Sequence, residues 1–524
     1  MLMFDFSRME SVADLSRVQA ADRPHAIALD YKDRLTTFRE LDERASRVAQ
    51  GLIALGQCAG ARVGYLGKNS DRYCEVLLGA FKARCVVVGV NWRLAPPEMA
   101  YVLNDAACEV LFVTREYMDL VDKITLDTPK LKTIIAIDGG DPRWESYEGW
   151  RDAHPATDPM LPVAPDDDVI QLYTSGTTGH PKGVRLTSAN YLAIFNCLSD
   201  MPLGAYTPDD VVLIAMPFFH VAGVNIALLS IGQGARGVIL GDIDAQEILR
   251  LFETKRVTYV FLVPAIIQFL LQQPNIRDID LSSLKNISYG ASPISDAVLL
   301  KAQEVFGCEF LQVYGLTETT GGGTFLSPED HAPERGRLRS CGKPAPHHEI
   351  RIVDAHSNAL PQGEVGEIAI RAPNVMKGYW NKDDATRASI SEGWFHTGDA
   401  GYFDAEGYLY IHDRVKDMIV SGGENIYPAE VENALMGHPA VADAAVIGVP
   451  DDKWGEAVKA IVVKKPGTSA TPAEIIAYAR GRIAGYKLPK SVDFADSLPR
   501  NPSGKILRRE LRQPYWEGRE RQVN

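Results

Sequence analysis

The sequence predicts an α/β fold with a large N-terminal domain of helix-flanked sheets, a small antiparallel, barrel-like part, and a smaller α+β domain at the C-terminus. Between residues 27 and 168, short apolar runs alternate with amphipathic stretches, and the same rhythm returns from residue 211 onward. This alternation is typical of parallel strands flanked by helices. From 365 to 411 the chain is instead rich in glycine, aromatic residues and acidic turns, which favours short antiparallel strands.

A charged pentad, Asp413-Arg414-Val415-Lys416-Asp417, lies between two apolar runs and marks the predicted domain boundary. We expect a large domain at 1–413, a hinge at 414–417 and a smaller, mobile domain at 418–524, whose size suits a separate domain. The smaller domain is expected to contain two helices, near 429–436 and 472–484, and two strands, near 444–448 and 457–463.

Individual elements of the large domain follow from hydrophobic periodicity. Apolar residues recur at three- and four-residue spacing from 41 to 55, which predicts a helix. Thr37, with Glu40 three residues later, has the form of a capping box that would begin this helix. Further helices are expected at 73–83 and 248–253, and strands at 63–66, 85–88, 110–113, 211–214, 237–240 and 259–262.

The composition excludes several classes of protein. Lys and Arg number 55 against 68 Asp and Glu, and the resulting net charge of −13 gives no global attraction for nucleic acid or anionic membrane. The seven cysteines form no C-x-x-C pair, which argues against a zinc knuckle or redox motif and suits a reducing cytoplasm. No apolar run approaches the roughly 20 residues of a membrane span. We expect a soluble, cytoplasmic protein, and leave open peripheral membrane contact and whether it is a monomer or a homodimer.

The most informative stretch, residues 173–184, reads Y-T-S-G-T-T-G-H-P-K-G-V. Its glycines let backbone N–H groups turn toward an anion, its hydroxyls add donors, and Lys182 adds a positive charge. This chemistry predicts a phosphate-binding loop. The expected phosphate-binding residues are Thr174, Ser175, Gly176, Thr177, Thr178, Gly179 and Lys182.

This loop differs from a Walker P-loop, because Pro181 replaces the second glycine and Gly183 replaces the Ser/Thr. Residues 184–187 alternate like a strand, and Ser188 is expected to cap the next helix. The loop is therefore predicted to join two strands, with no helix N-terminus pointing at the phosphate.

Two further stretches contain residues suited to a nucleotide. In Q-V-Y-G-L-T-E-T, which begins at Gln312, Tyr314 can stack on a purine, while Thr317 and Glu318 could hold Mg²⁺ on phosphate oxygens. In H-T-G-D, Asp399 can accept hydrogen bonds from both ribose hydroxyls.

Other signals are weaker. Lys505, on a Pro/Gly loop near the C-terminus, becomes functional only if a domain motion carries it to the phosphates. G-A-S-P-I at 290 lacks the last glycine of a nucleophile elbow. H-E-I-R-I lacks the second histidine of a zinc protease, so His347 and His348 are expected at the surface. The basic tail at 505–521 is expected to be a solvated helix.

Together, these stretches resemble the adenylate-forming superfamily of acyl-CoA synthetases, luciferases and peptide-synthetase adenylation domains, over nearly the whole chain. Within it the sequence looks most like the fatty-acyl-CoA synthetases. The motifs occur in the family's order: Y-T-S-G-T-T-G-H-P-K-G at 173, P-F-F-H at 217, Y-G-A-S at 289, Y-G-L-T-E at 314, T-G-D at 397, D-R-V-K-D at 413, S-G-G-E-N at 421 and N-P-S-G-K at 501.

The resemblance implies an ATP-dependent acyl-CoA ligase that uses Mg²⁺ and converts a carboxylic acid and CoA into acyl-CoA, AMP and pyrophosphate through an acyl-adenylate. A medium- or long-chain fatty acid is the expected substrate. An aryl or arylpropenoic acid, and an enzyme that loads a carrier protein, remain alternatives. A catalytically silent nucleotide or lipid sensor is disfavoured by the lysines at 182, 416 and 505.

For ATP, the resemblance implies that the loop from Thr174 to Lys182 grips the β- and γ-phosphates and that Thr317 and Glu318 serve the magnesium site. Gly290, Ala291, Ser292 and Tyr314 would hold the adenine, and Asp399 and Arg414 the ribose. Gln312 is counted with this nucleotide-binding set.

The resemblance also implies that Lys505 bridges the substrate carboxylate and the α-phosphate, so it is grouped with Thr317 and Glu318 as catalytic. Lys416 would be the hinge about which the small domain rotates. The loop at Gly422 and Gly423 would approach CoA in the second half-reaction.

The acid is expected to bind in an uncharged pocket. Amino-acid-activating relatives carry an aspartate soon after the aromatic core motif, yet nothing acidic lies between His220 and Asp242. The proposed pocket residues, which leave room for an extended acyl chain, are His220, Val221, Gly223, Gly321 and Gly322.

Overall fold

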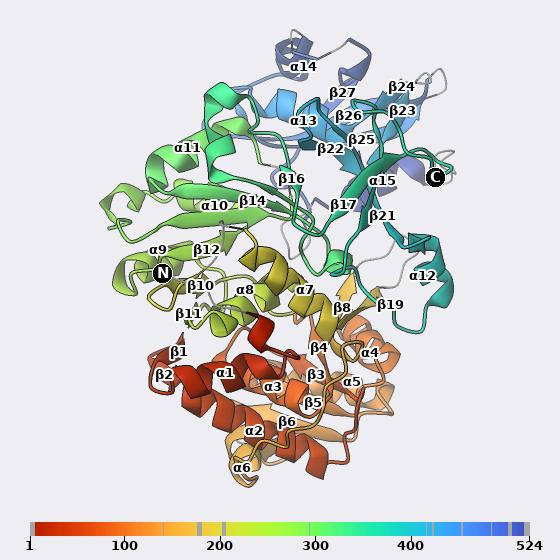
Figure 1. The fold of residues 1–524 in the computed structure, drawn as a ribbon. Coiled ribbons are helices and arrows are strands. Elements are labelled where there is room, and N and C mark those ends of the chain that lie inside the picture. The colour runs from red at the N-terminus through yellow and green to blue at the C-terminus, as the bar shows by residue number, and fades with distance from the viewer. Residues whose placement is uncertain are drawn as a thin grey trace.

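The structure is a computed structural model that describes residues 6–139, 141–174, 181–201, 206–292, 294–414, 417–421, 424–451, 454–480, 482–483, 485–500 and 506–517. Four β-sheets organise these residues. In Figure 1 the chain begins in the red and orange elements at the bottom, passes through the green elements in the middle and ends in the blue elements at the top.

The first sheet has eight strands, of which β4, β3, β5 and β6 are parallel neighbours. Its order is β19 (Gly378–Tyr379), β9 (Lys182–Thr187), β8 (Asp168–Thr174), β4 (Val86–Val90), β3 (Arg62–Leu66), β5 (Val110–Thr114), β6 (Thr133–Ile137) and β7 (Glu145–Ser146). The helices of this region are α1 (Asp14–Asp22), α2 (Phe38–Ala54), α3 (Asp71–Lys82), α4 (Pro96–Asp105), α5 (Met118–Ile124), α6 (Tyr147–Asp152) and α7 (Ser188–Ser199).

The second sheet has nine strands and contains a parallel run from β1 through β11, β10, β12 and β13 to β14. Its order is β16 (Lys343–Pro344), β15 (Thr324–Leu326), β14 (Glu309–Tyr314), β13 (Asn286–Gly290), β12 (Tyr259–Leu262), β10 (Val211–Ile214), β11 (Arg236–Ile239), β1 (Ile27–Tyr31) and β2 (Arg34–Thr37). The connecting helices are α8 (Val221–Gly232), α9 (Ala245–Thr254), α10 (Pro264–Leu271) and α11 (Asp296–Phe306).

The third sheet is antiparallel, as the glycine-rich composition of 365–411 predicts. Its strands are β17 (Glu349–Val353), β18 (Gly366–Arg371), β21 (Trp394–Phe403), β20 (Ile390–Ser391) and β22 (Leu409–Arg414), and α12 (Asp383–Ser389) precedes β20. Apart from β19, the strands of the two larger sheets precede this sheet in sequence, and it completes the mixed α/β architecture of the N-terminal region.

The fourth sheet belongs to the C-terminal segment, which has a hydrophobic core of its own around Ile419, Val431 and Val458. The strands are β24 (Glu424–Ile426), β23 (Ile419–Ser421), β26 (Gly455–Lys464), β25 (Val441–Asp451) and β27 (Ser491–Phe494), with helices α13 (Pro428–Met436), α14 (Pro472–Arg480) and α15 (Arg508–Trp516). These elements form the blue part at the top of Figure 1.

The described part of the basic tail forms the predicted surface helix, α15, none of whose residues is fully buried, and one side of it packs on the C-terminal sheet. Leu511 and Tyr515 of α15 pack against the apolar face of β25. Arg512 also forms an ion pair with Asp417 at 2.9 Å. The apolar residues spaced four apart therefore decide where α15 lies, and its charged residues pair at the edges of that contact.

Most predicted elements of the large domain are confirmed to within a few residues, including the capping box of Thr37 and Glu40 that begins α2. The predicted cap of α7 is wrong. Thr187 accepts the capping hydrogen bond from the Asn190 N–H, whereas the Ser188 hydroxyl accepts one from the Val12 N–H. The local rule correctly placed a hydroxyl cap there but chose its neighbour.

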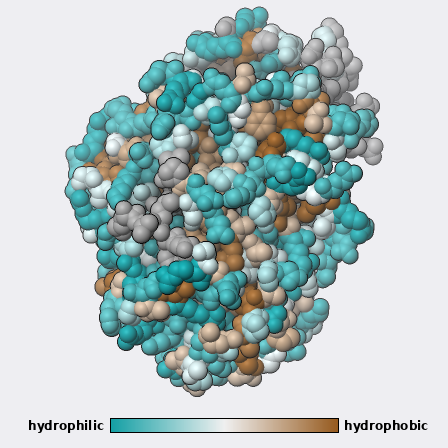
Figure 2. All heavy atoms as spheres, viewed as in Figure 1, coloured by the Kyte–Doolittle hydropathy of each residue, from teal (hydrophilic) through white to brown (hydrophobic). Residues whose placement is uncertain are grey.

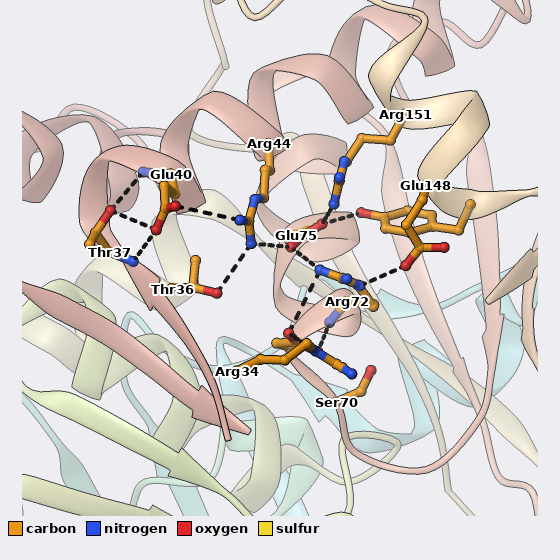
Figure 3. A network of polar contacts seen from close by, with 12 residues as sticks. Arg34, Thr36, Thr37, Glu40, Arg44, Ser70, Arg72, Glu75, Glu148 and Arg151 are labelled. Carbon is orange, nitrogen blue, oxygen red and sulfur yellow. Dashed lines mark hydrogen bonds and ion pairs between the residues drawn. The ribbon is translucent and has the colours of Figure 1, made fainter. Parts of the chain in front are cut away.

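A buried ion network holds three helices of the first region together (Figure 3). Glu75, on α3, is fully buried and accepts hydrogen bonds from Arg72 and Arg151, each at 2.9 Å. Arg44 of α2 lies 3.4 Å from the same carboxylate, and the Tyr147 hydroxyl donates to it at 2.7 Å. A buried carboxylate needs such partners, because leaving it uncompensated costs several kcal/mol, about 3 to 5.

Hydrophilic residues cover much of the face drawn in Figure 2, with hydrophobic residues exposed in smaller areas between them. None of the described helices has the length and apolar character needed to cross a membrane.

Candidate functional site

The site begins at the carboxyl ends of β13 and β14, which are parallel neighbours in the second sheet. Gly290 lies opposite Val313, so the start of the Gly290-Ala291-Ser292 segment lies beside the end of β14, where Tyr314 is. A Cβ atom on Gly290 would lie 2.2 Å from the Val313 carbonyl oxygen, which only glycine avoids. Ala291 follows with a φ of +67°, a left-handed turn at the strand end.

Tyr314 connects this edge to the T-G-D turn of β21. Its hydroxyl donates a hydrogen bond to Asp399 Oδ2 at 2.9 Å, and both residues are buried. Burial, together with the neighbouring carboxylate, raises the pKa of Tyr314 well above its usual value, so the phenol stays protonated and donates. The Asp399 N–H donates to Thr397 Oγ1, and the backbone of Asp399 pairs with that of Arg414 in β22.

Gln312 lies in the same strand as Tyr314 and faces Cys341. Its Nε2 donates to the Cys341 Sγ at 3.5 Å, while its Oε1 is buried without a hydrogen-bond partner in the described part of the chain. A buried acceptor left in this way could accept an N–H from a bound molecule.

A second group of predicted residues gathers where the two large sheets approach each other. Thr174 ends β8, and its hydroxyl donates to Glu318 Oε1 at 3.2 Å. Tyr379 of β19 donates to the same oxygen at 3.1 Å, and Lys182 Nζ lies 4.8 Å from the centre of the Tyr379 ring. The structure thus brings Thr174, Lys182 and Glu318 together, although they are far apart in sequence.

Glu318 occupies a short 3₁₀ turn, Thr317–Thr319, whose backbone is held by Asn374. Asn374 Nδ2 donates to the Thr319 carbonyl at 2.6 Å and to the Gly322 carbonyl at 3.1 Å. Thr320 adopts a φ of +48° between these points, and its hydroxyl donates to the Asn374 carbonyl at 2.7 Å. These contacts fix the turn that presents Glu318.

The donor set at Glu318 suits a magnesium ion bound mainly through phosphate and water. The carboxylate and the hydroxyls of Thr174 and Thr317 are oxygen donors, which Mg²⁺ prefers, and Mg²⁺ usually takes only one or two protein carboxylates. No cluster of three or more His, Cys, Asp or Glu that could enclose a metal occurs among the residues with described positions. The residues therefore fit an ion that arrives with a nucleotide.

The predicted acyl-pocket residues meet where α8, α7 and the Thr320–Gly322 backbone converge. His220 occupies the N-cap position of α8 without a side-chain capping hydrogen bond, and Asn225 of α8 donates to the Thr320 carbonyl at 2.8 Å. Gly223 packs so closely that a Cβ would lie 2.3 Å from the Pro217 carbonyl oxygen, and a Cβ on Gly322 would lie 2.3 Å from Ile194 Cδ1. Val221 opens α8, and both its methyl groups lie within 4 Å of the Cβ position of Gly321.

His220 is held neutral in this environment. Burial, and then the charge of Arg93, lower the pKa of His220 from 6.5 to about 4. His348 departs from its predicted surface position, because it is buried and its pKa is lowered by that burial, whereas His347 is exposed. The polar residues next to His348 gave no sign in the sequence that this residue, which directly precedes β17, is buried.

A groove of about 700 Å³ lies elsewhere on the described surface. It is lined by Tyr259, Lys285 and Glu309, at the amino-terminal ends of β12, β13 and β14, opposite the edge that carries Gly290 and Tyr314. Ligands of such sheets bind outside the carboxyl ends of the strands, so the groove is not part of the candidate site.

Some predicted residues lie outside the described residues: Ser175, Gly176, Thr177, Thr178, Gly179, Lys416, Gly422, Gly423 and Lys505. The side chain of Arg414 is likewise not described. Tyr379 and Asn374 are the contacts that sequence reasoning missed. Neither stands in a motif with a mechanism of its own, and only pairing across the sheets brings them to Glu318.

Comparison with known proteins gives the family. The model of the AMP-binding enzyme family matches residues 16–380, and that of the AMP-binding enzyme C-terminal domain matches residues 430–505. Fatty acid–acyl-carrier-protein ligase ScoC of Streptomyces coeruleorubidus is 39% identical over 99% of this chain and 99% of its own length. Feruloyl-CoA synthase of an Amycolatopsis species is 40% identical over 94% of this chain and 96% of its own.

Among solved structures, the Mycobacterium tuberculosis fatty acyl CoA synthetase covers 98% of this chain and 100% of its own, with 34% sequence identity and a TM-score of 0.78. The chain belongs to the AMP-binding enzyme family, in the adenylate-forming superfamily near the fatty-acyl-CoA synthetases, and is an AMP-forming acyl-CoA synthetase. ATP, CoA and a small carboxylic acid are the substrates of this class.

Proposed function

We propose that this enzyme joins a medium- or long-chain fatty acid to CoA. The observation that carries the proposal is the absence of charge from α8, the helix that contains Val221 and Gly223 of the candidate acyl pocket. This helix has no acidic residue in its first turn and no basic residue in its last. Its sequence, VAGVNIALLSIG, contains no charged residue at all. A helix of this kind gives an extended hydrocarbon chain apolar contacts and offers a charged substituent no partner.

Relatives support the same substrate class. The carrier-protein ligase ScoC acts on a fatty acid by its name, as does the M. tuberculosis synthetase. The similarly related feruloyl-CoA synthase acts on an arylpropenoic acid, so an aryl acid is the second candidate. The chain is 39% identical to ScoC and 40% identical to feruloyl-CoA synthase, so overall identity does not distinguish the two substrate classes. The side chains around the pocket decide between a fatty acid and an aryl acid.

The chemistry proceeds in two balanced steps. A carboxylate oxygen of the acid attacks the α-phosphorus of ATP, the bond to the bridging oxygen breaks, and pyrophosphate leaves with that electron pair. The CoA thiolate then attacks the acyl carbon, and AMP leaves with the oxygen that came from the acid. The thiol proton passes to solvent. No protein nucleophile is required, so the enzyme works by positioning and by electrostatic stabilisation of developing charge.

The described residues supply the nucleotide contacts in this scheme. Gly290, Ala291, Ser292 and Tyr314, with Gln312, surround the adenine, and Asp399 accepts hydrogen bonds from the ribose. Lys182 and Thr174 lie at the phosphates. Thr317 and Glu318 would hold Mg²⁺, which supplies charge neutralisation to the phosphate oxygens. Their grouping around one strand edge and one 3₁₀ turn supports these roles.

The proposed roles extend to residues outside the described part of the chain and to the side chain of Arg414. Ser175 to Gly179 complete the phosphate loop, Lys505 bridges the acid and the α-phosphate, and Arg414 joins Asp399 at the ribose. Gly422 and Gly423 approach CoA.

Lys416 serves as the hinge at 414–417 between a large domain, 1–413, and a small one, 418–524. The separate core of the C-terminal segment supports such a division. One described contact across it is a long hydrogen bond, 3.4 Å, from Gln268 Nε2 on α10 to the Ala442 carbonyl on β25.

The experiment is a competition among acids. The purified enzyme is incubated with ATP, MgCl₂, CoA and equal concentrations of decanoate, palmitate, ferulate and indoleacetate, and the thioesters and AMP are quantified by mass spectrometry. We expect decanoyl- or palmitoyl-CoA to dominate, with AMP formed in equal amount. An excess of feruloyl-CoA or indoleacetyl-CoA would mean that the preferred substrate is an aryl acid and not a fatty acid.

A parallel reaction replaces CoA by a phosphopantetheinylated acyl carrier protein, because the ScoC relative acts on such a carrier. We expect the thioester to form on free CoA with the higher kcat/KM. Acid-dependent pyrophosphate exchange with no acyl-CoA, together with rapid loading of the carrier protein, would identify the carrier as the acceptor.

A further inference from the structure

Tyr379 touches two residues of the candidate phosphate site at once. Its hydroxyl donates to Glu318 Oε1 at 3.1 Å, and Lys182 Nζ lies 4.8 Å from the centre of its ring. The side chain is only 7% exposed. One buried residue therefore contacts both the carboxylate and the ammonium group.

The backbone around Tyr379 is tied to both of these partners. Tyr379 pairs with Val184 in β9, the strand that begins at Lys182, and the next N–H, of Trp380, donates to the Gly183 carbonyl at 2.8 Å. On the other side, the Met376 N–H donates to the Glu318 carbonyl at 2.8 Å. The segment 376–380 thus spans from the 3₁₀ turn that contains Glu318 to the end of the predicted phosphate loop at Lys182.

The hydrogen bonds at Glu318 are unequal between its two oxygens. Thr174 and Tyr379 both donate to Oε1, whereas Oε2 accepts no hydrogen bond in the part of the chain that the structure describes. Two donors on one oxygen fix the plane of the carboxylate and leave the other oxygen available to an incoming ligand. The Tyr379 ring contributes differently, because a cation above an aromatic face is attracted to it without a hydrogen bond.

We infer that Tyr379 is a positioning residue that orients Glu318 for magnesium through its hydroxyl and holds Lys182 near the phosphates through its ring. This inference rests on the proposed function, in which Glu318 and Lys182 serve ATP. Tyr379 itself touches neither substrate nor metal. Its effect on ATP therefore depends on these two neighbours, and each contact can be removed separately.

Isothermal titration calorimetry with ATP, in the absence of any acid, tests the inference without turnover. Each protein is titrated once with MgCl₂ present and once with EDTA. The magnesium ratio, which is the Kd in EDTA divided by the Kd in MgCl₂, measures the contribution of magnesium to ATP binding. For Tyr379→Phe, which keeps the ring, we expect this ratio to fall by about tenfold, because a hydrogen bond to a charged group is lost. For Tyr379→Leu we expect ATP binding in EDTA to weaken further, by about threefold, because the ring is lost as well.

A double-mutant cycle separates positioning from a general structural effect. In a Glu318→Gln background, Tyr379→Phe should change the magnesium ratio by less than about twofold, since its partner carboxylate is gone. Equal losses in both backgrounds would overturn the inference, as would a Tyr379→Phe enzyme with the wild-type ratio.

Tyr408→Phe is the matched control. Tyr408 is also 7% exposed, donates to a carboxylate, Asp330, at 3.0 Å, and has Arg337 over its ring at 4.0 Å. It should leave the magnesium ratio unchanged, and an equal fall there would overturn the inference.

If Tyr379→Phe does not fold, Thr174→Val removes the other donor to the same oxygen and should give the same signature. A wild-type ratio in that variant would overturn the inference. Should Glu318→Gln and Lys182→Ala themselves leave ATP binding unchanged, the proposed phosphate site fails. If those two variants weaken binding and Tyr379→Phe does not, only the positioning role fails.

Discussion

The Tyr314 hydroxyl donates to Asp399 Oδ2 at 2.9 Å and so joins the last residue of β14 to the T-G-D turn of β21. These strands belong to different sheets, and the two residues are 85 positions apart in sequence. A residue suited to stack on a purine and one suited to bind a ribose are thereby held at a fixed separation.

Tyr314→Phe should weaken ATP binding while preserving stacking. The variant leaves the buried Asp399 without its phenol donor, and a lost hydrogen bond to a charged group costs about 1.5 to 3 kcal/mol. We expect the Kd for ATP, measured by calorimetry, to rise by about tenfold or more. Discrimination between ATP and 2′-deoxy-ATP should shrink in the same variant, and an unchanged preference would show that Asp399 does not contact the ribose.

His220 should make the protein lose stability in mild acid. The pKa of His220 is lowered by burial from 6.5 to about 4, so between these values the unfolded chain binds more protons than the folded one. The free energy of unfolding therefore rises with pH across this window and falls as pH is lowered through it, by up to about 3 kcal/mol at pH 4. Urea denaturation at a series of pH values measures this loss.

The control for that series is a pair of substitutions. His220→Gln cannot be charged and should flatten the dependence between pH 6.5 and 4, whereas His25→Gln, at an exposed position, should not. A wild-type slope in His220→Gln would mean that other groups, such as the buried His331 and His348, account for the loss.

Gly322→Ala should alter the acyl pocket by displacing Ile194. The added Cβ would lie 2.3 Å from Ile194 Cδ1, the far end of a flexible side chain, so the cost is overpacking of about 1 to 3 kcal/mol. We expect kcat/KM to fall more for palmitate than for hexanoate. Adding Ile194→Ala should restore palmitate, and failure to do so would place the acyl chain elsewhere.

Gly223→Ala provides a contrast at the same pocket. Its Cβ would lie 2.3 Å from the Pro217 carbonyl oxygen, which belongs to the backbone and cannot rotate away. We expect the enzyme to have a lower Tm whichever ligand is present, and the order of its acid preference to be unchanged. A selective change in chain length would mean that the backbone here moves.

Glu75→Gln tests the buried network of the N-terminal region. Glu75 is fully buried beside Arg72 and Arg151, and removal of its charge takes a fully buried partner from both cations, at a cost of about 3 to 5 kcal/mol. Glu148→Gln removes a partly exposed partner of Arg72 and should cost less than about 1 kcal/mol. Equal losses in the two variants, measured by urea denaturation, would contradict the assigned importance of burial.

Sequence alone gave much of this fold because local rules were strong where they applied. The capping box at Thr37 and Glu40 and the apolar runs of β3, β5 and β12 can be recognised from neighbouring residues alone. The antiparallel third sheet followed from composition for the same reason. The prediction of phosphate, purine and metal chemistry also rests on short motifs in which the suitable residue types occur together.

The contacts that join the motifs could not be predicted. Tyr379 reaches Glu318 across 61 residues, and Asn374 reaches Thr319 across 55, through pairing that no local pattern records. The tail helix α15 was predicted, but its contact with β25 through Leu511 and Tyr515 was not, because the charges of this segment are more conspicuous in the sequence than two apolar residues. Long-range packing decided each of these cases.

The most direct test of the central claim, that the acid attacks the α-phosphorus of ATP, is an isotope transfer. Decanoate labelled with ¹⁸O in its carboxylate is converted with ATP, MgCl₂ and CoA. The ¹⁸O content of AMP and pyrophosphate is then measured by mass spectrometry. The account predicts that each AMP carries one ¹⁸O atom and that pyrophosphate carries none. Label in inorganic phosphate or pyrophosphate, or ADP in place of AMP, would contradict it.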